Sequence, residues 1–150
     1  MSAVIERIAR ARAARDWNAF AKDIPYAAWL GIEVDASAPK IVVALRHAPM
    51  QIGNASIPAV HGGVIGALLE HAAVFTLLDE AETVVLPKTI TFTVDYLRSA
   101  RAVDTFARAT ITRQGRRVST VRVEAWQDDP ARPVAAGNGH FLVMRDGEGG

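Results

Sequence analysis

The sequence predicts an α+β fold in which an antiparallel β-sheet surrounds one long central helix. Two observations lead to this prediction. Between Val64 and Leu78 nearly every residue is apolar, which is typical of a helix that is buried on most of its sides. On both sides of this segment the chain has short runs rich in β-branched residues, and the sheet that they form must cover the helix.

The chain begins with another helical pattern. Apolar residues recur at approximately helical spacing over residues 4–22, and Pro25 limits the helix that they predict. With 150 residues there is room for one hydrophobic core and little more. The predicted organisation is therefore a helical extension over residues 1–26, a single domain over 27–146 and a flexible tail over 147–150.

Six strands are predicted around the central helix. Before it, "GIEVDAS" and "KIVVALRH" form a hairpin or a bent pair, and residues 48–59, which have two prolines and no periodicity, are predicted to form a loop. After Pro87, apolar residues alternate with three threonines and Asp95, as in a half-buried strand. The last three strands are predicted from "DTFARATITR", "RRVSTVRVEAW" and "PVAAGNGHFLVM".

Composition excludes several classes of protein. Lys plus Arg is 17 and Asp plus Glu is 16, and a net charge of +1 gives no general attraction to nucleic acid or anionic membranes. The absence of cysteine excludes disulfides, thiolate nucleophiles and cysteine metal sites. No secretory signal is present, and Glu70 and His71 interrupt the longest apolar segment. We therefore expect a soluble, cytoplasmic protein.

The start of the central helix is the first candidate site. His61 is followed there by Gly62 and Gly63, and small residues let a ligand approach the unpaired N–H groups of a helix start. Such donors can hold a carbonyl oxygen. Taken alone, the two glycines more often mark a tight turn and close packing.

Glu70 is the second candidate, because it interrupts the most apolar helix. We expect it to be buried, and a buried carboxylate without a partner is unfavourable unless it has a use. The alternatives are a solvated or interfacial face of the helix, or an arginine partner from elsewhere. His71 points about 100° away from Glu70. A packed or inter-subunit histidine is therefore expected, and not a catalytic pair.

Other catalytic patterns are absent from the sequence. It contains no G-x-S-x-G nucleophile motif and no H-E-x-x-H metal motif. Arg113, Arg116 and Arg117 cluster around Gly115, and a hairpin with these side chains can bind phosphate or carboxylate groups. Such a run is more often a solvated turn.

Three features occur together: Asn54, "HGGVIGALLE" at 61–70 and "TITFTVDYLRSA" at 89–100. This combination, followed by the basic hairpin, resembles the hotdog-fold acyl-CoA thioesterases, particularly the phenylacetate-degradation type and the related 4-hydroxybenzoyl-CoA type. The similarity runs from "AAWLGIEV" at 27–34 to "GHFLVM" at 139–144. It implies a central helix wrapped by an antiparallel sheet, and a homodimer or homotetramer with active sites between protomers.

The resemblance also implies roles for residues of the central helix. By position, Glu70 corresponds to the catalytic carboxylate, which acts as general base on water or as nucleophile at the thioester carbonyl. The backbone N–H of Gly63 would polarise the thioester oxygen. His61 and Asn54 would shape and orient that site.

Residues outside the helix take further roles under the same resemblance. Thr89 corresponds to a hydroxyl residue that some members contribute from the partner subunit, where it helps to position water. Arg98, Arg116 and Arg117 fall where relatives often contact the phosphates of coenzyme A. No metal or redox cofactor is implied.

The expected activity is hydrolysis of an acyl-CoA thioester to a free acid and coenzyme A. Two alternatives stay open: a non-catalytic module that binds acyl-CoA, and, ranked lower, a hydratase or dehydratase of acyl thioesters. Trp17, Tyr26 and Trp29 could cover an apolar or aromatic acyl group, although packing of the first helix is the commoner role of such residues.

Overall fold

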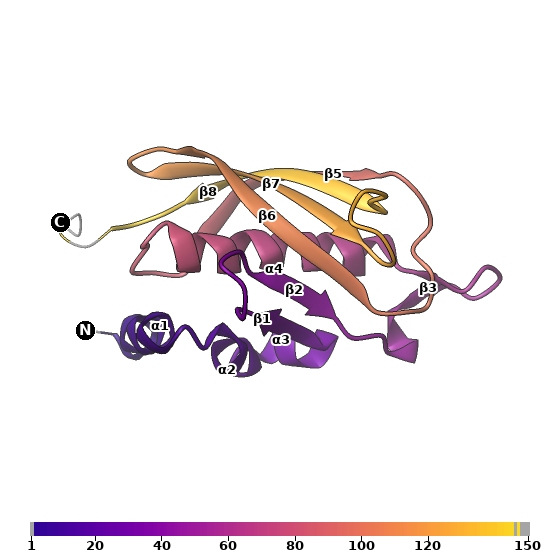
Figure 1. Cartoon of the computed structure of the whole chain (residues 1–150), viewed down its shortest axis with the longest axis horizontal. Coiled ribbons are helices and arrows are strands. Elements are labelled where there is room, and N and C mark those ends of the chain that lie inside the picture. Colours follow the sequence, from indigo (N-terminus) through magenta and orange to yellow (C-terminus); the bar gives the residue numbers. More distant parts are fainter. Residues whose placement is uncertain (1, 146, 148–150) are drawn as a thin grey trace.

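The computed structural model describes residues 2–145 and 147. Six antiparallel strands form its main sheet in the order β1-β2-β6-β7-β8-β5, and this sheet curves over the helix α4 (Figure 1). The predicted α+β class and its central helix are confirmed. Residues 148–150 of the predicted tail lie outside the described residues. The elements are α4 (Gly62–Glu80), β1 (Ile32–Asp35), β2 (Val42–Leu45), β5 (Lys88–Tyr96), β6 (Thr105–Gln114), β7 (Val118–Trp126) and β8 (Ala135–Leu142).

The helix α4 is apolar because it forms the centre of the core. Its 19 residues would also suffice, by length and composition alone, to cross a membrane. Here the helix packs against the inner face of β6 and β7, as expected for the core helix of a globular domain. Its fully buried apolar side chains are those of Ile65, Leu68, Leu69, Ala72, Ala73, Phe75, Leu77 and Leu78.

The amino-terminal segment forms three helices, so the prediction of one continuous helix over residues 4–22 is wrong. Arg15 adopts a left-handed conformation with φ of 51° and ends the first helix. The Asp16 side chain then accepts a hydrogen bond from the Ala19 N–H and caps the second. Apolar periodicity cannot reveal a change of direction at one residue. The helices are α1 (Ala3–Ala14), α2 (Trp17–Lys22) and α3 (Pro25–Leu30).

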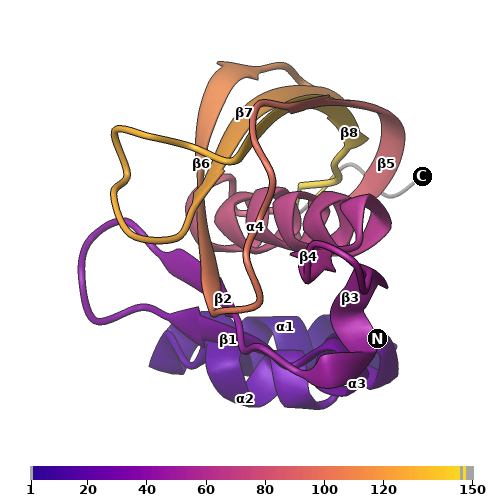
Figure 2. The same cartoon turned by 90° about the vertical axis from the view of Figure 1, so that its right-hand side faces the viewer.

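These helices cover the side of α4 that faces away from β5–β8 (Figure 2). Ile8, Trp17 and Phe20 are part of the same hydrophobic core as α4. The helix α3 also spans the predicted boundary between residues 26 and 27. The amino-terminal segment is therefore a layer of the domain.

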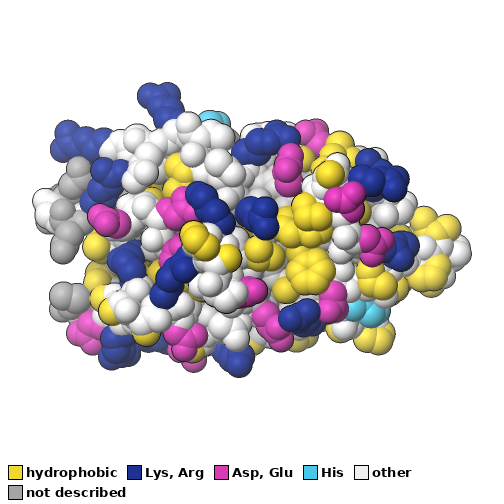
Figure 3. Space-filling view, in the orientation of Figure 1, with side chains coloured by type: hydrophobic (Ala, Val, Ile, Leu, Met, Phe, Trp, Pro, Cys, Tyr) yellow, Lys and Arg dark blue, Asp and Glu magenta, His cyan; other side chains and the backbone are white. Residues whose placement is uncertain are grey.

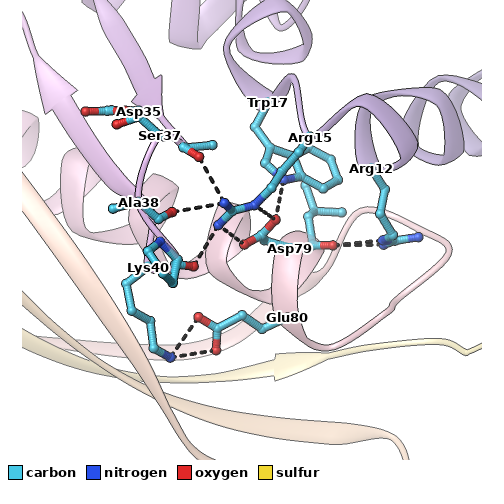
Figure 4. Close-up of polar contacts among 12 residues, drawn as sticks. Arg12, Arg15, Trp17, Asp35, Ser37, Ala38, Lys40, Asp79 and Glu80 are labelled. Atoms are coloured by element: carbon cyan, nitrogen blue, oxygen red, sulfur yellow. Dashed lines mark hydrogen bonds and ion pairs between the residues drawn. The ribbon is translucent and has the colours of Figure 1, made fainter.

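A polar network joins this layer to the end of α4 (Figure 4). Asp79 accepts hydrogen bonds from the Trp17 Nε1 at 2.8 Å and from the Arg15 guanidinium at 3.1 and 3.2 Å. Arg12 donates to the carbonyl of Leu78, one of the four that an α-helix leaves unpaired at its end. Lys40 pairs with Glu80 on the surface. The end of α4 is thus held by side chains of the amino-terminal helices and of the segment between β1 and β2.

The segment 48–59 is more regular than the predicted loop. It contains a 3-10 turn, η1 (Pro49–Gln51), and the hairpin of β3 (Ile52–Asn54) and β4 (Ala59–Val60). These strands are too short to show an alternation of apolar and polar residues in the sequence. Contacts from outside the segment stabilise them, since the Val60 N–H donates to the Ala100 carbonyl.

The strand β5 is an edge strand of the main sheet, because it pairs with β8 alone. Its prediction as a strand is confirmed, but its predicted half-burial is not. Ile90 and Tyr96 are more than half exposed, and Phe92 and Val94 are partly exposed. The single chain leaves both the hydrogen-bonding edge of β5 and much of its apolar side uncovered.

Candidate active site

The helix α4 begins with a cap made by His61. The His61 Nδ1 accepts a hydrogen bond from the Gly63 N–H at 2.8 Å, and the imidazole is exposed. Gly53 of β3 lies directly against this histidine, because a Cβ at position 53 would lie 2.7 Å from the His61 Cα. The β3–β4 hairpin therefore supports the helix start where we expected a substrate oxygen to bind.

Two backbone N–H groups at the start of α4 differ in whether they already donate a hydrogen bond. The Gly63 N–H, predicted as the oxyanion donor, is engaged by His61. The Gly62 N–H donates to no protein acceptor within residues 2–145 and 147. The Gly62 carbonyl accepts a hydrogen bond from the Tyr96 hydroxyl at 2.8 Å. An oxygen can therefore bind Gly62 directly, whereas binding to Gly63 requires the His61 ring to turn away.

Glu70 is exposed in the single chain, so the expectation of a buried carboxylate is wrong. The sheet and the amino-terminal helices leave one strip of α4 uncovered, and Glu70 lies in that strip with Gly63, Ala67 and Val74. Its carboxylate makes no hydrogen bond or ion pair within the part of the chain that the structure describes. The alternative of a solvated or interfacial face fits this position.

Glu70 and Gly63 lie on nearly the same side of α4. Seven residues of an α-helix turn through almost two full turns and span about 10 Å. The Glu70 side chain leans toward the helix start, which shortens the gap. Gly66 and Ala67 lie between them, and a Cβ at position 66 would meet no atom closer than the Tyr96 hydroxyl at 3.7 Å. The small residues leave space for a planar carbonyl group between donor and carboxylate.

His71 packs beside this strip and does not pair with Glu70. Its Nδ1 lies 2.7 Å from the Ala67 carbonyl, one turn earlier in α4. Its ring lies 6.0 Å from the ring of Tyr26 in α3. The prediction of a packed histidine is confirmed.

Asn54 lies at the end of β3, close to the helix start. Its Oδ1 accepts a hydrogen bond from the Ser56 N–H at 3.0 Å, which makes a local turn. Its side-chain amide N–H groups donate to no acceptor within the described residues. Asn54 therefore follows Gly53, the residue that lies against His61, but no hydrogen bond joins its side chain to the start of α4 within the described residues.

The structure does not bring Thr89 to this site within one chain. Thr89 pairs with Phe141 at one end of β5, while Tyr96, at the other end, contacts Gly62. Seven residues of a strand span about 23 Å. A contact between Thr89 and the start of α4 therefore needs a second chain.

The three predicted arginines divide between the two ends of the domain. Arg98 borders a pocket of about 420 Å³ that also contacts Gly62 and Tyr96. Arg117 borders a second pocket, of about 350 Å³, with Lys88 beside it. Arg116 lies next to Arg117 in the turn between β6 and β7. One chain does not gather these arginines into a single anion site.

Two residues of the site were not predicted from the sequence. Tyr96 falls within the strand predicted after Pro87, and Gly53 falls within the loop predicted over residues 48–59. Their contacts with Gly62 and His61 join segments that are far apart in sequence. The alternation in β5 could have placed Tyr96 on a face of the sheet, but no sequence signal indicated what that face meets.

Within the described residues, no three His, Asp or Glu side chains cluster in a way that could hold a metal ion. Basic and acidic side chains are interspersed on the face shown in Figure 3. That face therefore lacks the continuous basic surface that nucleic acids require.

The architecture and the helix-start site match a known family. The model of the thioesterase superfamily matches residues 58–134, which include the start of α4, Glu70 and β5. The chain belongs to the thioesterase superfamily. It is a thioester hydrolase with a hotdog fold, as the resemblance in the sequence implied.

Individual relatives of this thioesterase agree with the assignment. The medium/long-chain acyl-CoA thioesterase YigI of Salmonella typhimurium is 31% identical over 138 residues, which cover 83% of this chain and 88% of YigI. A crystal structure from Chromobacterium violaceum is 34% identical, with a TM-score of 0.76, and covers 95% of this chain and 99% of that one. The Escherichia coli PaaI structure, from the phenylacetic acid degradation operon, has a TM-score of 0.73 at 21% identity and shares the fold. It covers 89% of this chain and 94% of PaaI.

Proposed function

We propose that this thioesterase hydrolyses acyl-CoA thioesters to a free carboxylic acid and coenzyme A. The name of the YigI relative, a medium/long-chain acyl-CoA thioesterase, supports this substrate class. The observation that carries the proposal is the position of Glu70. It is an exposed, unpaired carboxylate on the same side of α4 as the glycines of the helix start.

The proposed reaction uses the two ends of this strip. The thioester oxygen binds the backbone N–H groups at the start of α4, where the helix dipole favours the negative charge of a tetrahedral intermediate. Gly62 can donate at once, and Gly63 donates when His61 turns away. The carbonyl carbon then lies above Gly66 and Ala67, within reach of Glu70.

Glu70 acts at this carbon in one of two ways. As general base it takes a proton from water, the water oxygen forms the new C–O bond, and the C–S bond breaks. As nucleophile it forms a mixed anhydride while the thiolate leaves, and water then hydrolyses the anhydride. In both cases the thiolate of coenzyme A takes up a proton. Asn54, through its free amide N–H groups, orients the carbonyl or the water.

We also propose that the active form is at least a homodimer, with Thr89 supplied by the partner chain. The uncovered edge of β5 and the uncovered strip of α4 support this assembly, because an unpaired edge can pair with a strand of a second chain, which would also bury exposed apolar side chains such as Ile90. A second chain can bring the end of β5 that carries Thr89 and Lys88 close to a helix start that it cannot reach within one chain. Arg98, Arg116 and Arg117 would then contact the phosphates of coenzyme A from two chains.

The test is thiol release from a panel of aryl- and fatty-acyl-CoAs by wild type, Glu70→Gln and Glu70→Ala. Loss of the base or nucleophile should lower kcat by about 10²- to 10⁴-fold in both variants. Glu6→Gln, which changes an exposed carboxylate of α1, should keep the wild-type rate. Equal kcat values for wild type and both Glu70 variants would contradict the role of this residue.

A further inference from the structure

Two aromatic side chains of α3 lie in solvent, although the face of this helix that carries Ala27 and Leu30 is buried. Tyr26 is 52% exposed and Trp29 is 64% exposed, while Ala27 and Leu30 of the same helix are buried. The two rings stack with centroids 6.0 Å apart and planes 23° apart. We refer to Tyr26 and Trp29 as the aromatic platform. Its orientation is set by the buried face of α3, so both rings must point outward.

The aromatic platform borders the strip of α4 that carries Glu70. The Tyr26 ring lies 6.0 Å from the ring of His71, the residue that follows Glu70. The contact of the His71 Nδ1 with the Ala67 carbonyl holds this imidazole in place. The Tyr26 ring therefore lies beside both the His71 ring and the Trp29 ring, and we refer to the three as the apolar row. Trp17 does not contribute to this surface, because its side chain is fully buried and its Nε1 donates a hydrogen bond to Asp79.

We propose that the aromatic platform binds the acyl chain of the thioester, so that Tyr26 and Trp29 determine chain-length specificity. This inference rests on the proposed function. A thioester held between the start of α4 and Glu70 sends one substituent toward Arg98, whose charge suits coenzyme A. The other substituent is the acyl chain, and the apolar row begins one residue beyond Glu70. Neighbouring rings of the row are 6.0 Å apart, so a medium or long chain can contact more than one ring, whereas an acetyl group does not need the row.

The first experiment measures kcat/KM for saturated acyl-CoAs from acetyl to palmitoyl. In wild type, each methylene that reaches the aromatic platform should raise kcat/KM about fourfold. Trp29→Ala and Tyr26→Ala should lower kcat/KM for palmitoyl-CoA about tenfold or more, mainly through KM, and change it less than about twofold for acetyl-CoA. Trp29→Phe should recover part of the loss. Val4→Ala, an exposed apolar residue of α1, should leave the profile unchanged.

The second experiment does not depend on turnover. The difference between the tryptophan emission spectra of wild type and Trp29→Phe reports the emission of Trp29. This emission should shift to shorter wavelength when a non-hydrolysable palmitoyl-CoA thioether binds. Free coenzyme A should cause no shift. If wild type hydrolyses thioesters but both alanine variants keep the chain-length profile of wild type, the inference is overturned and the proposed function stands. No turnover by wild type would overturn the proposed function, and the emission shift would then decide the inference. A change in oligomeric state with an unchanged profile would assign the aromatic platform to a subunit contact and overturn it as well.

Discussion

At the scale of single residues, the start of α4 shows how one side chain can serve both folding and chemistry. His61 caps the helix by accepting the Gly63 N–H, and the same N–H is a proposed donor to the substrate. A substrate that uses Gly63 must therefore replace the imidazole, whereas Gly62 needs no rearrangement. The hydrogen bond from Gly63 to His61 therefore stabilises the helix start but makes the Gly63 N–H unavailable to the substrate.

The cap can be tested by stability. We expect His61→Ala to lower the free energy of unfolding by about 1 kcal/mol, because the Gly63 N–H loses its acceptor. His61→Asn should keep most of the stability, since asparagine is a good N-cap. Denaturant unfolding of the three proteins measures the difference. An Asn variant as unstable as the Ala variant would show that the imidazole contributes by packing against Gly53.

A second residue-scale prediction concerns Thr76, which is buried within α4. Its hydroxyl oxygen has no hydrogen-bond partner within the described residues. Thr76→Val keeps the shape and removes the unsatisfied group, so it should raise the free energy of unfolding by about 1 kcal/mol. In a domain of this size the melting temperature should rise by about 3 °C.

The matched control for this change is Thr83→Val. The Thr83 hydroxyl bonds to the carbonyl of Val85 and to both backbone groups of Met144. Its loss should destabilise the protein by about 1 to 3 kcal/mol. Melting temperatures that fall equally in both variants would mean that Thr76 is bonded after all.

At the scale of elements, the network around Asp79 joins α1 and α2 to the end of α4. Burial raises the pKa of Asp79, but hydrogen bonds from Arg15 and Trp17 and the charges of Arg15 and Arg12 outweigh it, so the pKa lies below its ordinary value. A carboxyl group with a lowered pKa stabilises the fold above the pKa of the unfolded chain, which is about 3.9. This contribution is lost as the pH falls through the lower, folded-state pKa.

Asp79→Asn tests this network. At pH 7 the variant should be less stable than wild type by about 2 kcal/mol, because a charged acceptor of three hydrogen bonds is lost. The difference should shrink as the pH falls from about 4 toward the lower, folded-state pKa, because the carboxyl group is protonated first in the unfolded chain and then in folded wild type. Denaturant unfolding as a function of pH measures it. Glu80→Gln, at a more exposed pair, should change stability by less than about 1 kcal/mol, and a pH-independent difference for Asp79→Asn would contradict the electrostatic account.

At the scale of the whole molecule, the single chain is incomplete along one side. The edge of β5 is unpaired and the strip of α4 beside it is uncovered. The two ends of β5 divide the predicted site, with Tyr96 at the helix start and Thr89 about 23 Å away. A symmetric partner along β5 would cover this side and join the two halves of the site.

Ile90→Lys tests the proposed assembly. Ile90 is 54% exposed on β5, and a charge there should weaken the dimer at least tenfold if the side chain is buried between chains, because burying an unpaired charge is unfavourable. Light scattering during size-exclusion chromatography measures the mass, and activity should become dependent on protein concentration. Val103→Lys, at a similarly exposed apolar residue outside β5, is the control. An unchanged mass for both variants would place the interface elsewhere.

The sequence by itself determined the parts of this protein that depend on local patterns. Apolar runs and strict alternation predicted α4 and the strands β1, β2, β5, β6, β7 and β8, and the residues from His61 to Glu70 indicated the family. These signals are reliable because the repeat of a helix or a strand determines which nearby residues share a face, so it can be recognised within one segment. The assignment of a thioester hydrolase rests on the residues from His61 to Glu70 together with Asn54 and residues 89–100, and on the match to the thioesterase superfamily over residues 58–134.

Tertiary structure alone decided which faces are covered and what meets at the site. The break at Arg15, the exposure of Glu70 and the contact between Tyr96 and Gly62 depend on segments far apart in the chain. The division of three aromatic residues into a buried Trp17 and the exposed aromatic platform has the same origin. Composition shows that a residue is apolar, but only packing decides whether the protein or a ligand covers it, because burial is a property of the assembled layers.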